Sequence, residues 1–173
     1  CGDLNLVLDN FSKDTRTIKA GDVYIGIKGE NFDGNLFFRD AFDKGAKACI
    51  LDNVEIKDNL DEYKNKTIIK VDDSLKCLEA LAKYKRSLYN IPVIAVTGSV
   101  GKTSTKDMIA SVLQTKYRVL KSEGNNNNNI GLPFTILRLK DEEIMVLEMG
   151  MNNPGEISLL TDIAKPTIGV ITN

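Results

Sequence analysis

The chain has 173 residues, of which 42% are hydrophobic and 27% are charged, and its formal net charge is −1. This composition excludes a disordered or fibrous chain and suffices for one ordinary domain with a core or for two small ones. Neither half carries the basic excess of a nucleic-acid-binding protein, so no nucleic-acid partner is expected.

Two amino-acid types narrow the possible chemistry. The chain has no histidine, which removes the commonest general base and the commonest transition-metal ligand. Its three cysteines lie far apart without a C-x-x-C pair, which argues against a disulfide framework or a zinc site and favours reduced thiols in the cytoplasm. No apolar run approaches the ~20 residues needed to span a bilayer, so no membrane insertion is expected. Any catalysis must therefore rest on phosphate, Mg²⁺ and carboxylates.

The first half of the chain alternates between strand and helix patterns. Short β-branched runs predict strands, and apolar residues spaced along one helix face predict helices. In order we expect a strand at 23–27, a helix at 36–44, a strand at 46–51, a charged loop at 52–66, a strand at 67–71 and a helix from residue 74. Because Pro92 bars continuation of that helix, we place a domain boundary between residues 90 and 92.

The second half continues the same alternation. We expect strands at 93–96, 118–121, 144–149 and 167–172, separated by helices at 102–117, 133–139 and 154–163. This order predicts a parallel sheet with right-handed crossovers, whose ligands bind at the carboxyl ends of the strands. The predicted fold class is therefore α/β, with a small domain at 1–90 followed by a parallel-sheet domain over 91–173.

A glycine-containing loop joins the strand at 93–96 to the helix that follows it. Residues 92–104 read P-V-I-A-V-T-G-S-V-G-K-T-S. In this context glycines can turn several backbone N–H groups toward one phosphate, beside the positive end of a helix dipole. Lys102 would contact the β- and γ-phosphates and Thr103 would bind Mg²⁺. The general G-x-x-x-x-G-K-[ST] pattern lacks its first glycine, because residue 96 is Val96, and an ordinary turn with a surface lysine is the alternative.

Two further segments are ambiguous by themselves. Glu148 ends an apolar strand, where it is either a second Mg²⁺ ligand or a carboxylate that faces solvent. The five asparagines at 125–129 are either a polar linker or a loop whose amides hold phosphate oxygens and a substrate peptide.

Several ordered motifs resemble those of the Mur ligase family of peptidoglycan synthesis. In the second half these are T-G-S-V-G-K-T-S-T-K-D at 97–107, G-N-N-N-N-N-I-G-L-P at 124–133, L-E-M-G-M-N-N-P-G-E-I at 147–157 and P-T-I-G-V-I-T-N at 166–173. In the first half D-T-R at 14–16, K-G-E-N-F-D-G-N at 28–35 and A-F-D-K-G-A-K-A at 41–48 are similar to the UDP-binding domain of the same family. The resemblance therefore covers nearly the whole chain.

The resemblance implies an ATP-dependent amide-bond ligase. The motifs are most similar to members that add D-alanyl-D-alanine to UDP-N-acetylmuramoyl-tripeptide through an acyl phosphate, with ATP and Mg²⁺ as cofactors. It implies ATP contacts at Thr97, Gly98, Ser99, Val100, Gly101, Lys102, Thr103, Ser104 and Asn173, and Mg²⁺ at Thr103 and Glu148. It places Lys102, Glu148 and Asn128 at the reaction, and substrate at Thr15, Arg16, Lys28, Asp33, Gly34, Asn35, Asn125, Asn127 and Asn128. The family often has histidine where Asn35 and Asn153 stand.

Other interpretations remain open at this point. One is a family member that adds the third amino acid of the peptide, and another is a non-catalytic nucleotide-binding module. A P-loop kinase fits poorly, because the first ninety residues would then have no role. The resemblance also implies a family C-terminal domain after Asn173, so this chain is expected to be a fragment that binds its ligands without completing the reaction.

Overall fold

A computed structural model describes residues 5–29, 32–53 and 66–173. Its internal contacts divide the chain into two compact units, Cys1–Leu78 and Glu79–Asn173, and the division falls within helix α2 (Ser74–Ser87). The domain boundary expected at residue 90 stays a prediction. Most of the charged loop expected at 52–66 lies outside the described residues. Both units are mixed α/β with parallel sheets, which confirms the predicted fold class.

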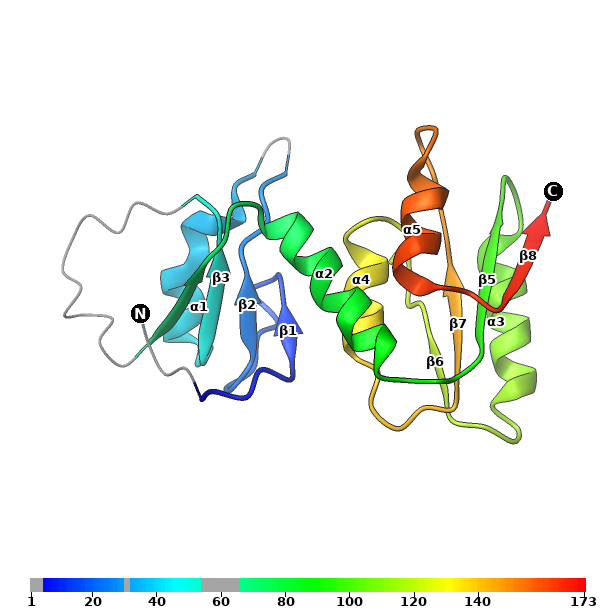
Figure 1. Cartoon of the computed structure of the whole chain (residues 1–173), viewed down its shortest axis with the longest axis horizontal. Helices are drawn as coiled ribbons and strands as arrows, with labels where there is room; N and C mark the ends of the chain where they lie inside the picture. The colour runs from blue at the N-terminus through cyan, green and yellow to red at the C-terminus, as the bar shows by residue number, and fades with distance from the viewer. Residues whose placement is uncertain (1–4, 30–31, 54–65) are drawn as a thin grey trace. The chain divides into compact units, whose positions relative to one another are not determined.

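The first unit is built on a parallel sheet of order β1-β2-β3-β4 (Figure 1). Its elements are β1 (Phe11–Ser12), β2 (Val23–Ile25), the 3-10 helix η1 (Gly34–Phe37), α1 (Phe38–Asp43), β3 (Ala48–Leu51) and β4 (Thr67–Lys70). Side chains of β2 and β3 are buried throughout, as in the centre of a parallel sheet. Of these, Tyr24, Cys49 and Leu51 pack with Phe38 and Phe42 of α1 into one apolar core.

The second unit holds a parallel sheet of order β6-β7-β5-β8. Its elements are β5 (Val93–Gly98), α3 (Lys102–Leu113), β6 (Val119–Lys121), α4 (Gly131–Leu137), β7 (Ile144–Glu148), α5 (Glu156–Ala164) and β8 (Ile168–Thr172). Each strand and helix expected in this half is present. Helix α3 ends earlier than expected, at Leu113, and α4 begins two residues before Pro133.

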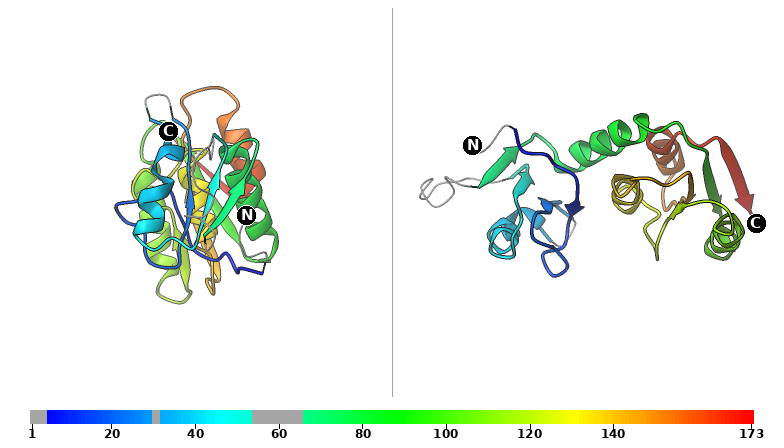
Figure 2. Two further views of the ribbon diagram at one scale, coloured as in Figure 1. Left: turned by 90° about the vertical axis from the view of Figure 1, so that its left-hand side faces the viewer. Right: turned by 90° about the horizontal axis from the view of Figure 1, so that it is seen from below.

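Alternating residues of β5 and β7 build two cores on opposite faces of this sheet. Ala95 and Leu147 belong to the core formed with α4 and α5, while Val96 and Val146 belong to the core formed with α3. The period of two along a strand produces this separation. Helix α3 therefore covers one face and α4 and α5 cover the other (Figure 2).

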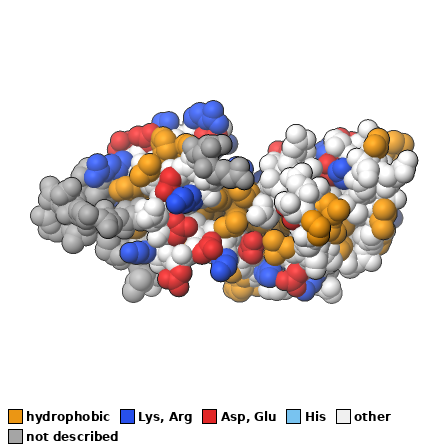
Figure 3. Space-filling view, turned by 90° about the horizontal axis from the view of Figure 1, so that it is seen from above, with side chains coloured by type: hydrophobic (Ala, Val, Ile, Leu, Met, Phe, Trp, Pro, Cys, Tyr) orange, Lys and Arg blue, Asp and Glu red, His pale blue; other side chains and the backbone are white. Residues whose placement is uncertain are grey.

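Acidic and basic side chains lie next to one another on the face shown in Figure 3, without a large area of one sign. Among the described residues, no helix is long and apolar enough to cross a membrane.

Candidate functional site

The glycine-containing loop connects the carboxyl end of β5 to the first turn of α3. Gly98 and Gly101 have φ values of +135° and +84°, a region that glycine adopts without the strain of a Cβ atom. The N–H groups of Ser99 and Val100 donate to the backbone oxygen of Asn173, at 2.8 and 2.7 Å. The loop is therefore anchored to the residue that follows β8. The backbone N–H groups of the first turn of α3 have no acceptor within the helix.

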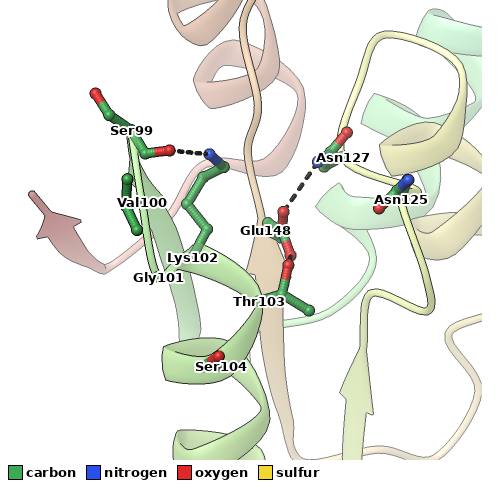
Figure 4. A pocket seen from close by; sticks show the side chains of 9 residues that line it. All are labelled: Ser99, Val100, Gly101, Lys102, Thr103, Ser104, Asn125, Asn127 and Glu148. Carbon is green, nitrogen blue, oxygen red and sulfur yellow. Dashed lines mark hydrogen bonds between the residues drawn. The ribbon is translucent and has the colours of Figure 1, made fainter.

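Lys102 folds back over this loop (Figure 4). Its Nζ donates to the backbone oxygen of Gly98 at 2.7 Å and to that of Ser99 at 3.5 Å. These two contacts keep the ammonium group beside the loop, close to the N-terminal end of α3. A positive charge and the positive end of a helix dipole thus lie at one place, which favours an anion there.

The carboxylate of Glu148 joins three segments that are far apart in the sequence. Glu148 is only 2% exposed at the end of β7. Its Oε2 accepts from Thr103 Oγ1 at 2.9 Å, and its Oε1 accepts from Asn127 Nδ2 at 2.9 Å. Its backbone N–H donates to Ser122 Oγ at 3.1 Å. The two residues expected to bind Mg²⁺ are thus in direct contact, since β5 and β7 are neighbours in the sheet.

These side chains surround an open pocket of about 610 Å³ (Figure 4). It is lined by Ser99, Val100, Gly101, Lys102, Thr103, Ser104, Asn125, Asn127 and Glu148. Every lining residue belongs to the set singled out from the sequence. Four other predicted site residues of the second unit, namely Thr97, Gly98, Asn128 and Asn173, lie outside the lining.

The asparagine run is joined to the site by hydrogen bonds. The backbone oxygen of Asn127 accepts from Gly150 N at 2.8 Å, so the loop is tied to the residue that follows Met149. Asn128 Oδ1 accepts from the N–H groups of Ile130 and Gly131, at 3.1 and 2.8 Å. Asn128 therefore supports the start of α4 with its side chain, whereas Asn127 turns toward Glu148.

The first unit places its predicted substrate residues after the carboxyl ends of the strands. Arg16 donates to both carboxylate oxygens of Asp14, with Nη2 to Oδ2 at 2.6 Å, and this pairing lowers the pKa of Asp14 to about 2. Thr15 lies in the same turn. Lys28 is exposed and pairs with Asp33 in an isolated antiparallel bridge. Thr15 and Arg16 thus follow β1, and Lys28 follows the neighbouring strand β2. Their role in substrate binding stays a prediction.

Asn35 occupies a different environment from its neighbours. It is fully buried, and its Nδ2 donates to Asp33 Oδ1 at 2.7 Å and to Asp52 Oδ1 at 2.8 Å. Its Oδ1 accepts from Asp52 N at 3.0 Å. The Asn35 amide therefore bridges the carboxylates of Asp33 and Asp52. Asp52 was missed by sequence reasoning, since a single aspartate at the edge of a polar loop carries no distinctive signal.

Gly34 and Asn153 also have clear structural positions. Gly34 N donates to Ile27 O at 3.0 Å, and a Cβ atom at Gly34 would lie 2.7 Å from that oxygen. Asn153 Nδ2 donates to Glu156 Oε1 at 3.1 Å, next to the start of α5. Gly34 thus permits a close approach of two backbone segments, and Asn153 supports a helix end.

Comparison with known proteins explains the two units. A model described as the Mur ligase middle domain matches residues 96–173, and one described as the catalytic domain of the Mur ligase family matches residues 9–86. The chain belongs to the Mur ligase family. The Mur ligase middle-domain model covers every residue that lines the pocket, and the other model covers the four strands of the first unit's sheet.

Two curated relatives of this Mur ligase chain are both named UDP-N-acetylmuramoyl-tripeptide--D-alanyl-D-alanine ligase. The Bacillus subtilis protein is 46% identical over 168 residues, covering 96% of this chain and 36% of that protein. The Synechocystis protein is 42% identical over 169 residues, with the same two coverages. The chain thus spans about a third of the length of these relatives.

Solved Mur ligase structures are also similar. A MurF ligase from Thermotoga maritima in complex with ADP has a TM-score of 0.79 at 37% identity, covering 94% of this chain and 36% of that one. A UDP-N-acetylmuramoylalanyl-D-glutamyl-2,6-diaminopimelate--D-alanyl-D-alanyl ligase from Acinetobacter baumannii has a TM-score of 0.84 at 31% identity, covering 95% and 36%.

Proposed function

We propose that this chain binds ATP in the pocket at Lys102 and UDP-N-acetylmuramoyl-tripeptide at the edge of the first unit's sheet. In the complete gene product these sites would serve the ligation of D-alanyl-D-alanine to the tripeptide, in the cytoplasm where ATP is available. The observation that carries the proposal is the meeting of Lys102, Thr103 and Glu148 around one pocket. The names of the curated relatives support the choice of substrates.

The donor set of the pocket fits Mg²⁺. Both side chains that donate to the buried Glu148 carboxylate, those of Thr103 and Asn127, are uncharged. A buried carboxylate gains much from a nearby cation, because neutral donors leave its charge uncompensated. Mg²⁺ prefers oxygen ligands and is often held by one or two protein carboxylates together with substrate phosphates. Thr103 and Glu148 are the residues proposed to hold it.

The proposed reaction follows from the weak electrophilicity of a carboxylate. Transfer of the γ-phosphoryl group from ATP to the tripeptide carboxylate gives an acyl phosphate, and attack by the amine of D-alanyl-D-alanine then forms the amide and releases phosphate. When bound, Mg²⁺ would neutralise charge on the phosphates. Lys102 and the N-terminal turn of α3 would stabilise the negative charge on the transferring group. Asn125 and Asn127 would lie beside the tripeptide carboxylate that accepts the phosphoryl group, since both line the pocket.

In the first unit we propose that the exposed Arg16 and Lys28 and the half-buried Thr15 contact the uridine nucleotide. Arg16 and Lys28 supply positive charge at the sheet edge, and Thr15 supplies a hydroxyl group there. Asn35 acts indirectly, because its amide is already bonded to Asp33 and Asp52. We give Asn128 and Asn153 supporting roles at helix ends for the same reason.

Nucleotide binding can be tested on the chain itself by calorimetric titration with ADP and Mg²⁺. Lys102→Ala should weaken ADP binding by roughly 10- to 100-fold, which is the affinity that one or two charge-assisted hydrogen bonds contribute. Lys116→Ala is the matched control, because Lys116 is an exposed lysine beyond the other end of α3. Equal affinity of the Lys102→Ala variant and wild type would refute the assignment of the pocket.

Substrate choice is tested with the complete gene product. Phosphate release from ATP should require UDP-N-acetylmuramoyl-tripeptide and D-alanyl-D-alanine together. Release with the dipeptide precursor and a diamino acid instead would identify a ligase for the third amino acid. Magnesium-dependent ADP binding without release in either mixture would leave a nucleotide-binding module.

A further inference from the structure

A buried lysine lies behind the pocket and is not part of its lining. Lys106 is only 2% exposed, although it belongs to helix α3. Its Nζ donates to the backbone oxygen of Ser122 at 2.9 Å and lies 3.4 Å from Asp107 Oδ1. Taking an ammonium group out of water is costly, and an apolar residue of similar volume often gives equal or greater stability at such a site. Stability alone therefore does not explain a lysine here.

The partners of Lys106 lead to the Glu148 carboxylate. Ser122 directly follows β6, and its Oγ accepts from Glu148 N at 3.1 Å. The N–H group of Ser122 donates to Val146 O at 3.1 Å, which extends the β6–β7 ladder by one step. Lys106 thus fixes Ser122 from α3, and Ser122 fixes the backbone of Glu148 at the end of β7.

The position of Lys106 on α3 relates this connection to the pocket. Lys106 comes three residues after Thr103 and four after Lys102, so the three side chains lie along one side of the helix. Helix α3 therefore reaches the end of β7 in two ways: directly from Thr103 to Glu148, and through Lys106 and Ser122. If Thr103 and Glu148 both turn oxygen atoms toward a cation, their mutual hydrogen bond weakens. The second connection does not depend on that bond.

We infer that Lys106 is a positioning residue, which through Ser122 holds Glu148 at the distance from Thr103 that a divalent cation requires. This inference rests on the proposed function, because it concerns the Mg²⁺ site of the same pocket. It predicts that loss of Lys106 weakens the dependence of nucleotide binding on Mg²⁺ while the fold persists.

The test uses the 173-residue chain and titration with ADP at a series of Mg²⁺ concentrations. In Lys106→Met we expect the Mg²⁺ concentration for half-maximal ADP binding to rise about tenfold, and ADP binding in EDTA to be unchanged. We expect the unfolding midpoint to be equal to that of wild type or higher. Ser122→Ala removes the hydroxyl that accepts from Glu148 N and should raise the Mg²⁺ requirement in the same way.

The matched control is Lys121→Met. Lys121 shares the partner Asp107, with Nζ 2.6 Å from Oδ1, and its removal should leave the Mg²⁺ requirement unchanged. A wild-type Mg²⁺ requirement in both Lys106→Met and Ser122→Ala would overturn the inference, even if the unfolding midpoint falls. A lower requirement in Lys106→Met would also overturn it, because the lysine would then act by charge repulsion. If wild type binds ADP independently of Mg²⁺, the metal assignment of the proposed function fails together with the inference.

Discussion

Replacement of Gly98 by alanine tests how tightly the loop is packed against β8. Gly98 pairs with Thr172 in the β5–β8 register. A Cβ atom on Gly98 would lie 2.3 Å from both the backbone oxygen and Oγ1 of Thr172, far inside any normal contact. Because the obstructing atoms include backbone, β8 would have to move. That movement would disturb the hydrogen bonds from Ser99 and Val100 to Asn173.

The expected cost of Gly98→Ala has two parts. The φ value of +135° imposes about 1–3 kcal/mol of strain on a residue with a side chain. Overpacking against β8 adds about 1–3 kcal/mol. We therefore expect the free energy of unfolding to fall by roughly 2–6 kcal/mol, a large fraction of the stability of an ordinary domain.

Gly101→Ala is the matched control for this substitution. Gly101 has a φ value of +84°, but a Cβ atom there would meet nothing within 4 Å, so only strain of about 1–2 kcal/mol is expected. The chain has no tryptophan, so urea unfolding should be followed by circular dichroism at 222 nm. If Gly98→Ala destabilises no more than Gly101→Ala, the close approach of Gly98 and β8 is refuted.

Two further substitutions test conformation and burial. Lys165 directly follows α5 and has a φ value of +47°, a left-handed conformation that glycine adopts with less strain. Lys165→Gly should therefore raise the free energy of unfolding by about 1 kcal/mol in urea titrations. A decrease instead would show that the exposed contact of Lys165 with Asp162 matters more than backbone strain. Burial raises the pKa of Cys49 from 9.0 to about 12, so the folded chain keeps a thiol proton that the unfolded chain loses. This contribution is complete below pH 9 and is lost as pH rises toward 12. Between pH 9 and 10.5 the stability of Cys49→Ala should therefore fall less steeply than that of wild type. The difference in slope should grow from about 0.7 toward about 1.4 kcal/mol per pH unit as the unfolded thiol ionises, and equal slopes would contradict the burial of the thiol.

The succession of elements could be predicted because local patterns and the sheet agree in this chain. Short apolar β-branched runs such as that of β5 are typical of strands buried in a parallel sheet, so they predict the strands of the second unit. β1 was missed, since Phe11–Ser12 is too short for any periodicity. The helix expected at 36–44 begins as the 3-10 helix η1, a distinction that depends on hydrogen bonds rather than on apolar spacing.

The sequence by itself determined the family motifs, the alternation of strands and helices, and the expectation that Lys102, Thr103 and Glu148 share one edge of a parallel sheet. These features depend on residues close in sequence or on the rule that parallel strands end together. Only the tertiary structure decided that Asn35 is buried between Asp33 and Asp52, and that Lys106 lies in the interior beside Ser122. Each of those environments is created by a segment many residues away, and a polar side chain carries no local sign of whether it will meet water or another buried group.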